Sequence, residues 1–150
     1  MADPAPPITP ENGSRFLVAI DGLNQLKNVV SVSGPDSFFD VIDQRSGSDT
    51  TTTPTQLPGL HHLTPIILRV GLTTDLSLFK LHADWVAGNR TRRSVVITLL
   101  DQTLKPVLEF RLSNAWPVRW TAPTLVATSN EVAIQTLELA YEQLDVRAVG

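Results

Sequence analysis

The clearest pattern in the sequence is an alternation of apolar and polar side chains between residues 107 and 120. The even positions hold Leu108, Phe110, Leu112, Trp116, Val118 and Trp120, whereas the odd positions include Glu109, Arg111, Ser113 and Arg119. A period of two predicts a β-strand with one face on the core. An unbroken strand of this length would span about 45 Å, far beyond the usual strand. We therefore expect a bend or bulge at Asn114, which is polar on the apolar face, and Pro117, which lacks an N–H for the ladder.

Shorter apolar stretches predict further strands, each bounded by turn signals such as Asp21-Gly22. They occupy residues 16–20, 28–33, 38–45, 65–70 and 94–100. The last stretch, SVVITLL, is apolar on both faces, which is typical of a central strand. Residues 46–56 are rich in Ser, Gly, Thr and Pro, so we expect a long exposed loop or hairpin tip there. A turn at Leu57-Pro58-Gly59-Leu60 is expected to end it.

One helix is expected at residues 74–87. Thr73 or Thr74 can cap it, Asp75 favours its positive end, and Gly88 suits the position just past its end. Its apolar side chains form a broad face, as in a helix packed on a sheet: Leu76, Leu78, Phe79, Leu81, Ala83, Trp85 and Val86. Residues 130–144 fit both a helical stripe and a strand face, and the pattern alone slightly favours a helix.

Composition narrows the class of protein. A chain of 150 residues is typical of one domain, and a formal charge of −3 gives no electrostatic footprint for nucleic acid. The absence of cysteine excludes disulfides and thiolate metal sites. Residues 1–14 contain four prolines and few bulky apolar side chains, so we expect a flexible arm. They lack the features of a signal peptide, and no apolar run approaches the ~20 residues of a membrane span, so synthesis in the cytoplasm is expected.

No motif for catalysis is present: there is no phosphate-binding loop, nucleophile elbow or HExxH pair. The candidate clusters are His61, His62, His82 and Asp84 for a metal; Asp40, Asp43 and Glu109 for acid–base chemistry; and Arg90, Arg92 and Arg93 for an anion. Neighbouring strand residues such as His61 and His62 point to opposite faces, which argues against a shared metal. Solvated side chains explain each cluster more simply. We expect no catalytic residue, no metal and no cofactor.

Two stretches carry a family resemblance. Asn114-Ala115-Trp116-Pro117-Val118 and the segment NEVAIQTLELA at residues 130–140 resemble the C-terminal signature of the contractile-tail tube family. This family includes the tail tubes of contractile phages and the inner tubes of phage-tail-like extracellular contractile injection systems. It is structurally akin to the secreted ring protein of type VI secretion. The resemblance covers roughly residues 15–144.

The resemblance implies a mainly β fold, a β-barrel-like sandwich of two sheets with one flanking helix around residues 74–87. A single tail-tube domain at 15–150, with an extended loop at 46–60, would follow the flexible arm at 1–14. The segment at 130–144 becomes a strand, and this overrules the helix that the pattern alone favours. Six copies would form a ring, and rings would stack into a hollow tube that a contracting sheath drives through an envelope.

The same resemblance suggests roles for particular residues. The stacking of one ring on the next is assigned to Ser46, Gly47, Ser48, Asp49, Thr50, Leu57, Pro58, Gly59 and Leu60. The packing and assembly signature consists of Trp116, Pro117, Trp120, Asn130 and Glu131. A polar face toward the channel or an interface is assigned to Glu109, Arg111 and Arg119. The expected partners are further copies of the chain, the sheath, the baseplate, a tube terminator and cargo in the channel, without a membrane segment or direct nucleic-acid binding.

The sequence leaves alternative functions open. Pro35, Tyr141 and the proline-rich N-terminus depart from the family pattern, which leaves open a paralogue that initiates the tube at the baseplate. A monomeric ligand-binding β-barrel module is a second alternative. A small hydrolase is a third alternative, but the sequence offers no nucleophile, base and orienting residue for it. The particle itself is either a phage tail or an injection device, which can be released outside the cell.

Overall fold

The computed structural model describes residues 15–45, 47, 53–128 and 133–149. In chain order the elements are β1 Phe16–Ile20, β2 Val29–Ser33, β3 Ser37–Gln44, β4 Thr55–Leu63, β5 Ile66–Gly71, α1 Ser77–Val86, β6 Arg93–Leu100, β7 Pro106–Thr121, β8 Ile134–Ala140 and β9 Gln143–Ala148. The fold is mainly β with one short helix, as the sequence predicts. Within these ranges no helix is long and apolar enough to cross a membrane.

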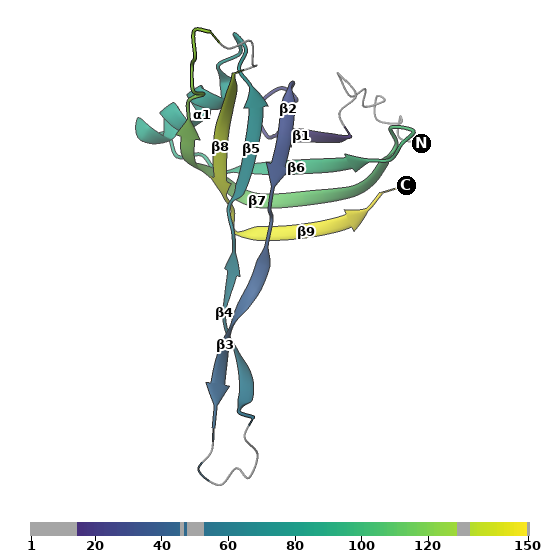
Figure 1. The fold of residues 1–150 in the computed structure, drawn as a ribbon, viewed down its shortest axis with the longest axis vertical. Coiled ribbons are helices and arrows are strands. Elements are labelled where there is room, and N and C mark those ends of the chain that lie inside the picture. Colours follow the sequence, from purple (N-terminus) through teal and green to yellow (C-terminus); the bar gives the residue numbers. More distant parts are fainter. Residues whose placement is uncertain (1–14, 46, 48–52, 129–132, 150) are drawn as a thin grey trace.

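The long strand β7 joins two layers (Figure 1). Its first half pairs with β6 on one side and β9 on the other, and its second half pairs with β8. The strand order is β1-β6-β7-β8-β5-β2, with β9 beside β7. We call β1, β6, β9 and the first half of β7 the transverse layer. We call β2, β5, β8 and the second half of β7 the axial layer, because these strands run along the longest axis of the molecule.

The change of direction in β7 occurs at Asn114, whose φ of +56° lies in the left-handed region. Asparagine tolerates this conformation better than most residues. The Asn114 side-chain amide donates a hydrogen bond of 3.1 Å to Glu142, and the Glu142 N–H donates to the Ser113 carbonyl at 3.0 Å. Glu142 lies between β8 and β9. Strand β7 and the segment from β8 to β9 that pairs with it therefore bend at the same point of the sheet.

The bend also changes which residues face the core, and here the expectation of an alternation without a phase change is wrong. Leu112 is fully buried before the bend, and Ala115, an odd position, is 2% exposed after it. A second register shift lies between Pro117 and Arg119 and restores the original phase at Trp120. The expected bend at Asn114 and irregularity at Pro117 are therefore confirmed, and each of them reverses the side-chain direction.

The core lies between the two layers. The transverse layer contributes Val18, Ile20, Val95, Ile97 and Leu112, and the axial layer contributes Ile66, Leu68, Val70, Leu137 and Leu139. The helix adds Leu78 and Leu81, and all of these side chains are at most 4% exposed. Burial of such side chains is the main stabilising contribution to the fold.

Helix α1 begins at Ser77, later than expected, because the polar residues before it form a turn instead. The Thr73 hydroxyl accepts from the Asp75 N–H at 3.2 Å, and the Asp75 carboxylate accepts from the Ser77 N–H at 3.1 Å. The helix ends as predicted, with Gly88 at a φ of +102° directly after its last turn. It packs against the second half of β7.

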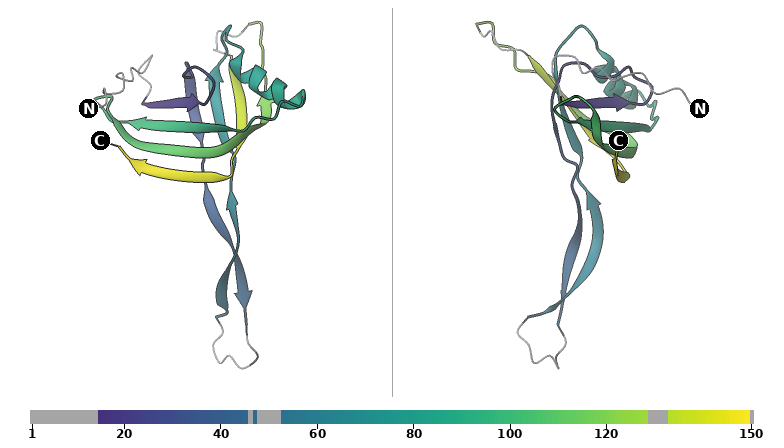
Figure 2. Two further views of the ribbon diagram at one scale, coloured as in Figure 1. Left: turned by 180° about the vertical axis from the view of Figure 1, so that it is seen from behind. Right: turned by 90° about the vertical axis from the view of Figure 1, so that its right-hand side faces the viewer.

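Strands β3 and β4 form a separate two-stranded sheet that projects from the two layers along the longest axis (Figures 1 and 2). We call these residues, 37–44 and 55–63, the arm. They continue β2 and β5, so the expected turn at Leu57–Leu60 is wrong: these residues lie within β4. Gly59 and Leu60 instead form a bulge on β4 opposite the single residue Asp40 of β3. A Cβ at Gly59 would lie 2.9 Å from the Asp40 Cβ, so glycine permits this close approach.

The C-terminal segment is extended. Strand β8 confirms the strand implied for this region, and the helix favoured by the pattern alone is wrong. Gln135, Leu137 and Leu139 all face the core, with exposed fractions of 4%, 0% and 1%. This spacing of two residues is that of a strand. Strand β9 was not expected from the sequence.

We expect replacement of Asn114 by Val to lower the free energy of unfolding by about 1–2 kcal/mol, because a β-branched residue is strained at positive φ. Asn114→Gly should cost less, since glycine adopts this conformation freely. Urea unfolding at a concentration where the chain is monomeric measures both, with Ser113→Ala as the control. Equal losses for Val and Gly would show that the hydrogen bond to Glu142 matters and the backbone conformation does not.

Candidate functional site

Several members of the polar clusters considered for chemistry form separate local contacts. On the arm, His61 lies 2.6 Å from the Ser37 hydroxyl, and His62 lies 2.8 Å from the Asp40 carboxylate. Glu109 instead forms an ion pair with Arg111 in the transverse layer. Asp43 lies on β3, and His82 and Asp84 lie on α1. In the described ranges, no group of three or more His, Cys, Asp or Glu residues could hold a metal ion.

The arginine cluster is also divided among separate partners. Arg92 forms an ion pair of 2.8 Å with Glu142, and it reaches the Asn114 carbonyl at 3.4 Å. Arg93 donates to the Asp21 carbonyl at 2.8 Å, which ties the end of β1 to the start of β6. Arg90 is exposed and forms no ion pair with any described residue. Among the described residues the cluster therefore leaves one cation without an ion pair, and its three arginines do not converge on a joint anion site.

The arm has an unusual surface. All eight residues of β3 are exposed, and large apolar side chains lie on both strands. Their exposed fractions are Phe38 46%, Phe39 58%, Val41 64%, Ile42 52%, Leu57 41% and Leu60 73%. The Phe38 ring stacks on His62 and the Phe39 ring lies tilted against His61. In the described part of the chain these apolar side chains otherwise remain exposed. A two-stranded ribbon is marginally stable alone, and an exposed apolar patch of this kind marks an interaction surface.

The residues proposed for ring stacking are divided by the structure. Leu57, Pro58, Gly59 and Leu60 lie on β4 within the arm. Gly47 lies in a turn beyond β3. Ser46, Ser48, Asp49 and Thr50 lie outside the described residues, as do Asn130, Glu131 and the expected N-terminal arm at 1–14.

The two tryptophans of the signature lie on opposite faces of β7, because Trp116 pairs with Ala140 whereas Trp120 pairs with the buried Leu137. Both contact the helix. The Trp116 ring stacks on that of Trp85 at 5.2 Å between centroids, and the Trp120 ring meets that of Phe79 edge-on at 5.0 Å. Trp120 also donates to the buried Gln135 at 3.0 Å. Pro117 is buried opposite Leu139.

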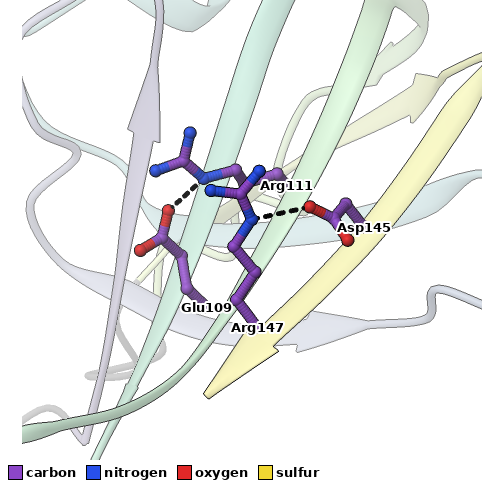
Figure 3. A network of polar contacts seen from close by, with 4 residues as sticks. All are labelled: Glu109, Arg111, Asp145 and Arg147. Atoms are coloured by element: carbon purple, nitrogen blue, oxygen red, sulfur yellow. Dashed lines mark hydrogen bonds and ion pairs between the residues drawn. The ribbon is translucent and has the colours of Figure 1, made fainter. Parts of the chain in front are cut away.

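The polar face of the transverse layer carries alternating charges (Figure 3). Glu109 and Arg111 form one ion pair on β7, and Asp145 and Arg147 form another on β9 at 2.7 Å. The register places Glu109 opposite Arg147 and Arg111 opposite Asp145, so every charge has opposite charges beside it. The two acidic and two basic side chains of this group therefore have a net charge of zero.

Of the three residues assigned to this face, the structure brings Glu109 and Arg111 together but places Arg119 elsewhere. Arg119 lies on the second half of β7, 3.9 Å from Glu138 of β8. Sequence reasoning missed Asp145 and Arg147. Their signal is an alternation after residue 142, in which Leu144 and Val146 separate the polar residues, but it is only six residues long.

Tyr141 lies at the junction of β8 and β9 and is 7% exposed. Its hydroxyl has no hydrogen-bond partner among the described residues. Burial, and secondly the negative charge of Asp36, raise the pKa of Tyr141 above its usual value of 10.0. The ring packs in the hydrophobic core, whereas the hydroxyl forms no hydrogen bond with a described residue.

We expect Tyr141→Phe to leave the free energy of unfolding unchanged or to raise it by up to about 1 kcal/mol, because an unpaired buried hydroxyl is removed. Urea unfolding measures this, with Tyr141→Leu as a control that also changes the packing. A loss above 1 kcal/mol for Phe would reveal a hydrogen bond to a residue outside the described ranges.

We expect Trp116→Ala to lower the free energy of unfolding by about 2–3 kcal/mol, less than for a fully buried tryptophan, because it removes the ring that holds α1 through Trp85. Trp116→Phe keeps an aromatic ring and should lose less. Thermal melting compares the two variants, and an unchanged melting temperature for Trp116→Ala would refute the packing role.

Comparison with known proteins places this geometry in a family. The sequence model of the T4-like virus tail tube protein gp19 matches residues 12–145. A chain in the sheath–tube complex of the extracellular contractile injection system PVC, in its extended state, is 29% identical, with a TM-score of 0.75 and coverage of 90% of this chain and 89% of that one. A chain in the 6-fold symmetrised baseplate of the anti-feeding prophage is 27% identical, with a TM-score of 0.73 and coverage of 98% and 97%.

The fold extends to more distant proteins. Hcp1 from Flavobacterium johnsoniae is 16% identical, with a TM-score of 0.62 and coverage of 89% of this chain and 94% of that one, which shows a shared fold alone. No curated protein matches the chain significantly. The matched family is structural and not enzymatic. Because the match covers nearly the whole chain, the protein belongs to the T4-like virus tail tube protein gp19 family.

Proposed function

We propose that the chain is the repeating inner-tube subunit of a contractile injection particle, in which six copies form a ring and rings stack into a hollow tube. The observation that carries this proposal is the arm, an apolar ribbon held away from the core of a tail tube protein. Related chains occur in a sheath–tube complex and in a 6-fold symmetrised baseplate. These complexes support six-fold rings and contacts with a sheath and a baseplate.

Ring formation would use the transverse layer. Strand β9 pairs with β7 on one side, and no described strand pairs with its other edge. An unpaired edge invites pairing with another chain. Head-to-tail pairing of this edge with the β1 side of the next copy would close a ring when the rotation permits. The charged face of the transverse layer, with Glu109, Arg111, Asp145 and Arg147, would then face the wet channel.

Ring stacking would use the arm. An eight-residue strand spans about 27 Å, which is long enough to leave one body and reach the next. The arm runs along the longest axis of the molecule, away from both layers (Figure 2). Burial of its apolar side chains against the next ring would supply the hydrophobic stabilisation that the isolated ribbon lacks.

In this function the subunit performs no reaction. The sheath contracts around the tube and the tube moves as a rigid body through the target envelope. A tube terminator closes one end, and the baseplate nucleates the other. Related chains occur in the tube terminating cap and in the baseplate of the anti-feeding prophage. Cargo in the channel would meet a surface whose ion pairs balance one another.

We expect the triple variant Phe39→Ser, Val41→Ser and Leu60→Ser to form single rings and no long tubes, because it removes the three most exposed apolar side chains of the arm without touching the core. Negative-stain microscopy of the purified protein measures ring and tube formation. The matched control, Val41→Ile with Leu60→Met, keeps the surface apolar and should form normal tubes. Deletion of residues 48–55 should likewise leave rings without tubes.

Two outcomes would contradict the proposal. Tubes of normal length from the triple variant would show that the arm does not stack rings. A monodisperse 16.4 kDa monomer from the unaltered chain, even at high concentration and with a baseplate nucleus, would exclude the tube function. Unaltered rings that bind a baseplate but never stack would favour the tube-initiating paralogue.

A further inference from the structure

We propose that the arm of one copy docks in a groove between α1 and the second half of β7 on a copy in the adjacent ring. The inference rests on the tube function proposed above and adds to it the receiving site. The groove has a volume of about 410 Å³ and is open to solvent. We call it the tryptophan groove, because Trp85 and Trp116 line it together with Val86, Val118 and Arg90.

The lining of the tryptophan groove suits an apolar strand. Val86 is 75% exposed and Val118 is 40% exposed, although both belong to regular elements beside the core. The stacked rings of Trp85 and Trp116 provide a flat aromatic surface. The Trp85 indole N–H has no acceptor among the described residues, and the carbonyls of a docked strand would offer one after a small rotation of the ring.

The charges of the two surfaces are complementary. The paired strands of the arm contain two carboxylates, Asp40 and Asp43, and neither Lys nor Arg; Arg45 follows beyond the last strand pair. Asp40 contacts His62, whereas Asp43 has no ion pair with any described residue. Arg90 at the tryptophan groove is likewise unpaired in the part of the chain that the structure describes. An acidic apolar ribbon thus matches a basic apolar groove.

The placement of the two surfaces fits stacking by translation. The arm and α1 lie toward opposite ends of the longest axis, as two views from opposite sides show (Figures 1 and 2). When a second copy is shifted along this axis, its arm end approaches the α1 end of the first copy. The contact is heterologous, so it repeats from ring to ring without closing and produces a filament.

The absence of cysteine from the chain permits a direct test by cross-linking. Leu60→Cys places a thiol on the arm and Val86→Cys places one in the tryptophan groove, at side chains that are 73% and 75% exposed. The two single variants are mixed, assembled and treated with a bismaleimide. We expect cross-linked dimers of the two variants in tubes and none in dispersed rings.

The control uses Leu104→Cys in place of Val86→Cys. Leu104 is 42% exposed and lies in the turn between β6 and β7. This turn and α1 lie on opposite sides of the molecule (Figure 1). No cross-link between Leu60→Cys and Leu104→Cys is expected. Tubes in which Leu60→Cys cross-links to Leu104→Cys, or to neither partner, would overturn the proposed receiving site while the tube function stands.

A second pair of variants tests the charge complementarity. Val86→Asp puts a carboxylate where the acidic arm would dock, so the protein concentration needed for tubes should rise at least about tenfold, with single rings unaffected. Val86→Lys adds a positive charge at the same exposed position and should change that concentration by less than about threefold. Equal effects of Asp and Lys, or no effect of either, would refute docking of the arm at this groove.

Discussion

The architecture depends on one backbone conformation, the left-handed residue Asn114 in the middle of β7. Because β7 turns there, a single strand belongs to both layers, and its partner ribbon turns with it where β8 passes into β9. The bend exchanges the inward-facing parity, so that Leu112 and Ala115 both face the core although they are three residues apart. Without this exchange Trp116 and Val118 would face the core in place of Ala115 and Pro117, and the groove beside α1 would lose both side chains.

The bend separates two surfaces with different tasks in the proposed tube. The transverse layer presents balanced ion pairs on its outer face and an unpaired edge at β9. The axial layer continues into the arm, whose apolar side chains find no cover within the described chain. Helix α1 closes the core with Leu78 and Leu81 and leaves its outer side to form the tryptophan groove. In the proposed tube, one subunit would therefore use separate surfaces for closing rings and for stacking them.

The elements that the sequence predicted are those with a local signal. Strands such as β1 and β6 are runs of apolar and β-branched residues between turn signals, and they lie within one residue of their expected bounds. Strand β4 was missed because Pro58-Gly59 reads as a turn, and only the bulge opposite Asp40 explains a glycine within a strand. The helix start was placed early because Thr73 and Asp75 cap a turn as well as they cap a helix.

The sequence by itself determined the fold class and the family, because strand alternation and the two C-terminal motifs are properties of contiguous residues. It also located the bend at Asn114 and Pro117. Only the tertiary structure decided which face each side chain occupies: it sets Trp116 and Trp120 on opposite sides of β7, pairs Glu109 with the β9 charges, and sends Arg119 to the other layer. The physical reason is that register shifts arise from pairing with distant strands, and one such shift reverses every side chain that follows it.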